Sequence, residues 1–94
     1  MPLDRRVEFK AVLQRGNRLQ LPKLVRWRHK LETDQILRVS VAVANMFGNW
    51  ESFLARMDKS GRITVPSLVL GQLGGRRPGI NLTGEVFKVL LEPA

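Results

Sequence analysis

An internal repeat constrains the fold of this chain more than any other feature. Residues 53–69 match residues 9–25 without a gap, 44 positions apart, and both share the pattern Phe-x-Ala, six residues, Arg-apolar-x-apolar-Pro-x-Leu-Val. Self-similarity of this kind indicates an internal duplication in which each copy is one supersecondary unit. The chain is therefore expected to fold as two similar units related by a pseudo-two-fold axis.

The first copy predicts the unit. Residues 7–13 alternate apolar and polar side chains, as expected of a strand with one buried side. A turn at residues 15–17 leads to a second strand at residues 18–21. Pro22 cannot donate to a ladder and suits the first turn of a helix. We expect a short amphipathic helix at residues 23–31, with Leu24, Val25 and Leu31 near one face, and a β-prone strand at residues 36–44.

The second copy repeats this order, with strands at residues 50–57 and 62–65 and a helix at residues 66–73. Residues 75–81 are then basic and Gly/Pro-rich and have no equivalent in the first copy, and the second repeat is six residues longer here, which predicts a surface loop. After it the repeat returns at an offset of 50, where residues 83–89 echo residues 33–39. One β-β-α-β unit cannot bury both sides of its sheet, whereas two can close into a barrel without exposed edges.

The predicted fold is mainly β. It is a six-stranded closed barrel made of two β-β-α-β repeats with pseudo-two-fold symmetry and two short helices. We expect a single barrel domain over residues 1–94, with repeat one at about 6–44 and repeat two at about 50–91.

Composition limits the chemistry. The 94 residues include no cysteine, so disulfides, thiolate chemistry and cysteine zinc sites are excluded. His29 is the single histidine and has no clustered carboxylates, so we expect no metal site. Neither a nucleophile paired with a base nor a phosphate-cradling loop is present. We therefore predict a non-enzymatic protein without catalytic residues, cofactor or small-molecule substrate.

The first residues lack the apolar segment of a signal peptide, and no run approaches membrane-spanning length. This predicts a cytoplasmic protein that does not span the membrane. The net charge of +8, from 16 Lys plus Arg against 8 Asp plus Glu, raises encounter rates with polyanions. Nucleic acid is the first candidate partner, followed by acidic proteins and anionic membrane surfaces.

The basic residues form two groups. Arg18 and Arg62 recur just after the turn in both copies, where a guanidinium could grip phosphate, or could instead pair with a turn acid or stack on the barrel rim. The helix of the first copy is crowded with cations that either contact phosphates or form a solvated face. The candidate nucleic-acid-binding residues are Arg15, Arg18, Lys23, Arg26, Arg28, Lys30, Lys59, Arg62, Arg76 and Arg77. Trp27 and Trp50 could stack on bases, but the favoured interpretation is core or rim packing.

Residues 60–66, Ser-Gly-Arg-Ile-Thr-Val-Pro, followed by a short helix and Thr83-Gly84-Glu85-Val86, resemble the AbrB/SpoVT family of DNA-binding domains. With both copies on one chain, the sequence looks more like the duplicated single-chain cradle-loop barrels, particularly the archaeal RIFT-barrel proteins. The resemblance implies a barrel that contacts DNA through the arginine after the turn and basic residues at the helix start. On this chain these are Arg18, Arg62 and Arg26.

The matching part of the second copy, Leu70 at the position of Arg26 and Gly71 beside it, is not basic, so the first repeat is expected to dominate binding. We expect a monomer or weak homodimer that binds nucleic acid, DNA rather than RNA, mainly through the phosphate backbone. The alternative is a protein-interaction or assembly module that binds no nucleic acid. A small ligand binder would need a pocket with convergent polar groups.

Overall fold

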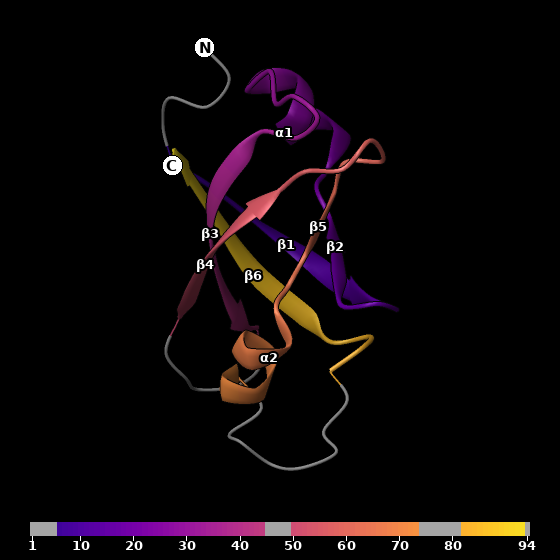
Figure 1. Ribbon diagram of the computed structural model, residues 1–94, viewed down its shortest axis with the longest axis vertical. Helices are drawn as coiled ribbons and strands as arrows, with labels where there is room; N and C mark the ends of the chain where they lie inside the picture. The colour runs from indigo at the N-terminus through magenta and orange to yellow at the C-terminus, as the bar shows by residue number, and fades with distance from the viewer. Residues whose placement is uncertain (1–5, 45–49, 74–81, 94) are drawn as a thin grey trace.

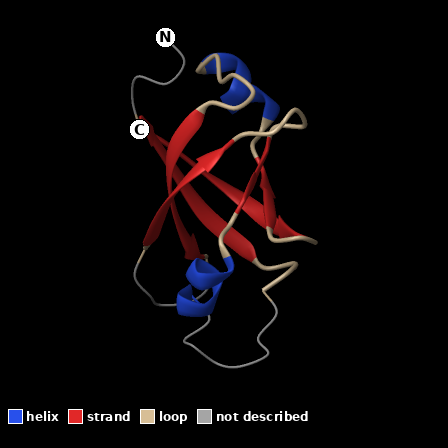
Figure 2. Ribbon diagram, in the orientation of Figure 1, coloured by secondary structure: helices blue, strands red, loops and turns tan. Residues whose placement is uncertain are grey.

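A computed structural model describes residues 6–44, 50–73 and 82–93. The elements are β1 (Val7–Gln14), β2 (Arg18–Gln20), α1 (Lys23–Arg28), β3 (Ile36–Val43), β4 (Glu51–Arg56), β5 (Arg62–Thr64), α2 (Ser67–Leu73) and β6 (Val86–Pro93). Figure 1 shows α1 and α2 at opposite ends of the strands, and Figure 2 shows how strands dominate the molecule. The prediction of a mainly β protein with two short helices is confirmed.

The six strands form one antiparallel sheet in the order β4-β3-β6-β1-β2-β5, which curls into a nearly closed barrel (Figure 1). The two ends of this order, β4 and β5, are joined within the described residues by a turn and not by a ladder. In that turn the Asp58 N–H donates to the Arg62 carbonyl oxygen at 2.9 Å. The predicted six-stranded barrel is therefore confirmed, with closure nearly complete.

Strand register follows the sequence repeat. Leu19 in β2 pairs with Ile63 in β5, and these residues are 44 positions apart. On the far side of the barrel Ser40 in β3 pairs with Leu90 in β6, which are 50 positions apart. Equivalent residues thus face each other across both ladders, and the pseudo-two-fold axis passes through these two pairs.

The same offsets relate the outer ladders. The β1–β6 pair Val7↔Leu91 corresponds to the β4–β3 pair Glu51↔Val41, and every rung between them is matched in the same way. Because side chains alternate between the faces of a strand, this register sends the odd-numbered apolar positions inward in both copies. The fully buried core residues are Leu13, Leu19, Leu21, Leu37, Val39, Val41, Ile63, Val65, Phe87, Val89 and Leu91.

Helix α1 ends at Arg28, three residues before the predicted end. Lys30 adopts a left-handed conformation with φ of 53°. The Lys30 N–H donates to Trp27 O at 3.3 Å, and the Leu31 N–H donates to Arg26 O at 3.0 Å. This is a Schellman motif, which satisfies the last helical carbonyls and stops the helix. Leu31 then packs against the core as the apolar residue of the motif.

The buried face of α1 is narrower than the sequence suggests. Val25 packs against the core, but Leu24 is 74% exposed. The expectation that Leu24 shares the buried face is therefore wrong. Core or rim packing was the favoured interpretation for both tryptophans. It is wrong for Trp27, which is 66% exposed. Trp50 is 42% exposed on the outer face of the sheet. Within the described residues, no helix is long and apolar enough to cross a membrane.

Candidate nucleic-acid interface

The two β-turns place cations at equivalent positions. Arg15 and Lys59 lie within the turns, and Arg18 and Arg62 begin the strands that follow. Each turn uses a left-handed residue at the same place, Asn17 with φ of 61° and Gly61 with φ of 78°. Their carbonyl oxygens accept reciprocal hydrogen bonds, from Val65 N–H at 2.7 Å and from Leu21 N–H at 2.9 Å. The turn of each copy is thus tied to the strand end of the other.

The two recurring arginines differ in their surroundings. Arg18 is exposed and its side chain folds over Gly16, so that a Cβ added there would lie 3.3 Å from Arg18 Nε. Arg62 is half-buried, and its Nε is buried without a hydrogen-bond partner. Within the described residues neither guanidinium forms an ion pair with Asp58, the acid of the turn. Asp58 Oδ1 accepts hydrogen bonds from the backbone N–H groups of Ser60 and Arg62, both at 2.9 Å.

Helix α1 carries the densest group of exposed cations. Lys23 and Arg28 are exposed on the helix, and Lys30 is exposed in the motif that ends it. The Lys23 Nζ lies 4.6 Å from the centroid of the Trp27 ring, a cation–π contact between positions one helical turn apart. The helix itself, Lys-Leu-Val-Arg-Trp-Arg, contains no acid.

Arg26 has a different position from the other cations of α1. It is half-buried, and its Nε donates to the Leu21 carbonyl oxygen at 3.2 Å. Its side chain covers Gly61, where an added Cβ would lie 2.6 Å from Arg26 Cζ. Arg26 therefore fastens the helix of the first copy to the turn of the second. Arg26, which the sequence predicted to contact nucleic acid, therefore has a structural role in this protein.

A second contact joins strand β2 to the same turn. The Gln20 Nε2 donates to the carbonyl oxygens of Ser60 at 2.9 Å and Gly61 at 3.2 Å. The turn that contains Lys59 therefore lies beside α1, and the β2–β5 ladder continues from it toward the other turn. We call this surface the basic ridge. It consists of Lys23, Arg28, Lys30, Lys59, Arg62, Arg18 and Arg15.

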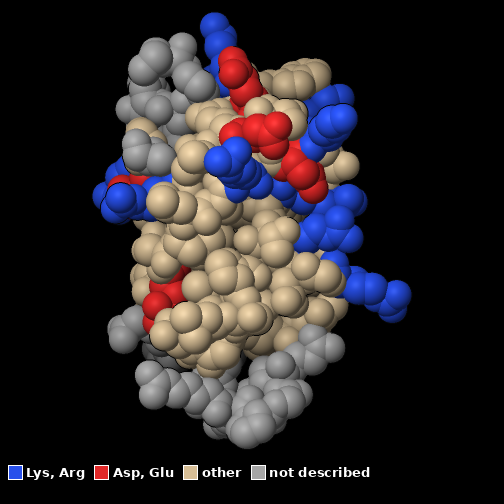
Figure 3. All heavy atoms as spheres, in the orientation of Figure 1, with Lys and Arg blue, Asp and Glu red and all other residues tan. Residues whose placement is uncertain are grey.

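Figure 3 shows Lys and Arg atoms gathered at the upper end and down the right-hand side of the molecule, where Figure 1 places α1 and the β2–β5 ladder. Acidic atoms lie among them at the upper end. Glu32 and Asp34 are exposed just after α1, and Asp58 is exposed in the adjacent turn. The ridge is therefore a row of cations with acids among them at its upper end.

The two helices differ sharply in charge although they occupy equivalent places in the fold. The positions that match Lys23, Arg26, Trp27 and Arg28 are Ser67, Leu70, Gly71 and Gln72. Helix α2, Ser-Leu-Val-Leu-Gly-Gln-Leu, contains no charged residue. Because α2 fills the same role in the second copy without cations, the barrel does not require the exposed cations of α1 for folding.

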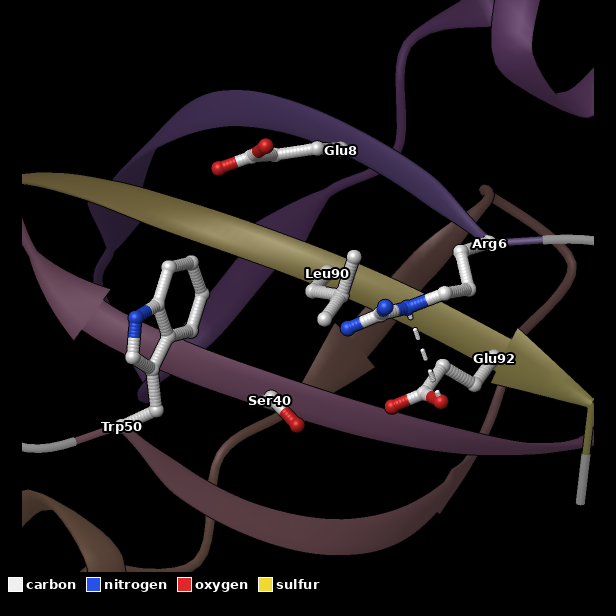
Figure 4. A pocket seen from close by; sticks show the side chains of 6 residues that line it. All are labelled: Arg6, Glu8, Ser40, Trp50, Leu90 and Glu92. Carbon is white, nitrogen blue, oxygen red and sulfur yellow. Dashed lines mark ion pairs between the residues drawn. The ribbon is translucent and has the colours of Figure 1, made fainter.

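A hollow of about 590 Å³ lies on the outer face of the sheet, at the strand pair on the pseudo-two-fold axis (Figure 4). Leu90 and Ser40 are at its centre, and Trp50 and Arg6 stand on either side. The Ser40 and Ser52 hydroxyl oxygens are 2.8 Å apart, and Arg6 Nε lies 3.8 Å from Glu92 Oε2. The lining residues are Arg6, Glu8, Ser40, Trp50, Leu90 and Glu92.

Sequence reasoning missed this hollow because its lining comes from β1, β3, β6 and the residue before β4, and the register of these strands was not known. The one feature of the sequence that could have indicated the hollow is a pair of acidic residues, Glu8 and Glu92, near the ends of two predicted strands. Of the predicted site residues, Arg76 and Arg77 lie outside the described residues. Within the described ranges, no group of three His, Cys, Asp or Glu side chains could hold a metal ion.

These features define a small antiparallel barrel built from two β-β-α-β repeats, with a basic ridge on one side. No protein-family model and no curated protein matches the sequence. The fold is similar to "The solution structure of PHS018 from pyrococcus horikoshii", with a TM-score of 0.70 and 22% sequence identity over 97% of this chain and 94% of that chain. This likeness supports the barrel fold. Membership of the AbrB/SpoVT family stays a hypothesis.

Proposed function

We propose that this protein is a non-enzymatic nucleic-acid-binding barrel that holds the phosphate backbone along the basic ridge. The observation that carries the proposal is the contrast between α1 and α2. Two helices with the same place in the fold differ in that one presents Lys23 and Arg28, and the other presents Ser67 and Gln72. Since the scaffold does not need these cations, a polyanionic partner supplies the reason for their presence.

The position of the other cations supports the same partner. Arg18 and Arg62 are diagonal neighbours on the outward face of the β2–β5 ladder, because Arg18 pairs with Thr64 and Gln20 pairs with Arg62. Diagonal positions on one face are about 7–8 Å apart between Cα atoms, close to the spacing of successive phosphates on a strand.

A salt titration with matched variants tests the proposal. Each phosphate neutralised contributes about −0.9 to the slope of log K against log salt on duplex DNA, and about −0.7 on single strands. The double variant Lys23→Ala/Arg28→Ala should bind more weakly and with a slope shallower by about 1 to 2. Arg38→Ala/Lys88→Ala, which removes the same charge from β3 and β6, is the control and should bind nearly as the natural protein.

Two outcomes would contradict the proposal. One is the absence of binding to any nucleic acid at low salt. The other is an equal loss in the ridge and control variants, because net charge alone would then account for the attraction.

A protein-interaction module is the second candidate, and the hollow on the outer sheet favours it. The hollow combines the Trp50 ring, the apolar Leu90 and the Glu8 carboxylate, which suit a cationic side chain of a partner, while Arg6 pairs with Glu92 at its edge. A Trp27→Phe variant leaves Trp50 as the single tryptophan. An arginine-rich peptide should change its fluorescence despite the +8 charge of the protein. An unchanged signal would rule out this candidate.

A further inference from the structure

Trp27 is a large apolar ring left in water. It is 66% exposed, and the contact it makes on the helix surface is with the Lys23 ammonium at 4.6 Å. Burying a ring of this size is a strong stabilising contribution in a small protein. Trp27 therefore does not pack in the hydrophobic core, and its ring is available to a partner.

The second copy shows that the fold does not need a ring here. The residue equivalent to Trp27 is Gly71, and a Cβ added at Gly71 would meet nothing within 4 Å. By contrast, Leu24 and its equivalent Leu68 are 74% and 75% exposed, so an exposed leucine is common to both helices. Trp27 is specific to the helix that carries the cations.

The charges around Trp27 identify a partner of matching chemistry. Lys23 lies over the ring, Arg28 is the next residue of the helix, and Lys30 follows in the chain. The helix offers no acid of its own, while Glu32 and Asp34 come after it. A polyanion with flat apolar groups complements this surface, because phosphates can meet the cations while a base covers the ring. In a duplex the base faces are stacked on each other, so the faces are available in unpaired strands.

We propose that Trp27 stacks on an unpaired base and that α1 is a single-stranded nucleic-acid site. This inference rests on the proposed function, and it names the form of nucleic acid that the basic ridge prefers. Lys23, Arg28 and Lys30 hold the phosphates on either side of the stacked base. Stacking is tolerant of base identity, since every base has a π-face. The site therefore selects unpaired strands over duplex without reading a sequence.

The two tryptophans make a direct test possible. In a Trp50→Phe variant, Trp27 is the single tryptophan, and the chain has no tyrosine. The variant is titrated at low salt with an oligothymidylate of about 12 nucleotides, within the range of known single-strand site sizes. An oligouridylate of equal length and a hairpin duplex are the other arms. Both single strands should quench Trp27 fluorescence, and the duplex should bind more weakly and quench little.

Substitutions of Trp27 separate stacking from charge. Trp27→Leu should weaken single-strand binding about 5- to 100-fold, whereas Trp27→Phe should retain most of the affinity because it keeps a ring. Duplex affinity should change little in either variant. Because the ring is exposed, both variants should keep the melting temperature of the natural protein, which is measured in parallel.

Each alternative outcome has a separate meaning. Equal affinity for duplex and single strands with no Trp27 quenching overturns the stacking site but leaves backbone binding intact. Equal quenching by polyglutamate also overturns it, because the surface would then be a general polyanion or acidic-protein site. No binding of any nucleic acid overturns both this inference and the proposed function.

Discussion

Leu19 and Ile63 pair directly across the β2–β5 ladder, and they are the same position of the two sequence repeats. Both side chains are fully buried. The pseudo-two-fold axis of the barrel therefore passes through its core, and residues from both copies complete the packing on the axis. Neither copy keeps an intact core without the other.

Shortening either residue of this pair should destabilise the whole barrel. Leu19→Ala and Ile63→Ala should each lower the free energy of unfolding by about 2–5 kcal/mol. Because the two side chains are opposite each other, the double variant should depart from additivity by about 0.5 kcal/mol or more. Urea denaturation followed by circular dichroism measures these values. Leu24→Ala, at an exposed position, is the control and should change stability by about 0.5 kcal/mol or less.

The fold was predictable because two independent signals agreed. The gapless repeat fixes two equal units, and the alternation of apolar residues fixes which side of each strand is buried. Residues 7–13 show that alternation with inward odd positions, as the ladders Val7↔Leu91 and Ala11↔Phe87 require. A duplicated unit that pairs with its own copy leaves few alternative registers.

The site was less predictable for physical reasons that differ between residues. A helix of six residues gives too few turns for periodicity to fix its buried face, which explains the errors at Leu24 and Trp27. The Arg26 contact with Gly61 joins two parts of the chain that are distant in sequence, so no local pattern could reveal it. The outer hollow depends on a row across three strands, Glu8, Leu90 and Ser40, which emerges from the register alone.

Alanine substitution should destabilise the protein at two glycines and stabilise it at a third. Gly61 has φ of 78° and an added Cβ would contact Arg26, so Gly61→Ala should destabilise the protein by more than about 1 kcal/mol. Gly84 has φ of 92° but open space around it, so Gly84→Ala should lower the free energy of unfolding by about 1 kcal/mol through backbone strain alone. Gly71 lies in α2 with open space, and Gly71→Ala should stabilise by about 0.5–1 kcal/mol. Thermal unfolding orders the three, and a destabilising Gly71→Ala would contradict this account.

Lys30 is a second test of backbone conformation, and it separates stability from binding. Its φ of 53° in the Schellman motif is a position that favours glycine, and the equivalent residue of the second copy is Gly74. Lys30→Gly should therefore raise stability by up to about 1 kcal/mol. The same change removes a cation from the basic ridge and should weaken nucleic-acid binding. Lys30→Ala, which removes the charge but keeps the strain, should weaken binding without the gain in stability.

Arg26 and Arg28 should differ in what they support, although they are two residues apart on one helix. Arg26 Nε donates to Leu21 O, and the side chain covers Gly61, whereas Arg28 is exposed. Arg26→Ala should lower the free energy of unfolding by about 1–3 kcal/mol through the lost hydrogen bond and packing. Arg28→Ala should change stability by about 0.5 kcal/mol or less and mainly weaken nucleic-acid binding.

The variant Arg26→Leu completes this comparison, because leucine is the equivalent residue of the second copy at position 70. It keeps apolar packing over the turn but loses the hydrogen bond to Leu21, so its stability should lie between those of the natural protein and Arg26→Ala. Chemical denaturation gives the stabilities, and a titration with nucleic acid at a temperature where all variants are folded gives the affinities. If Arg26→Ala is as stable as Arg28→Ala and binds more weakly, Arg26 is a phosphate contact and the fastening of α1 to the Gly61 turn is not its main contribution.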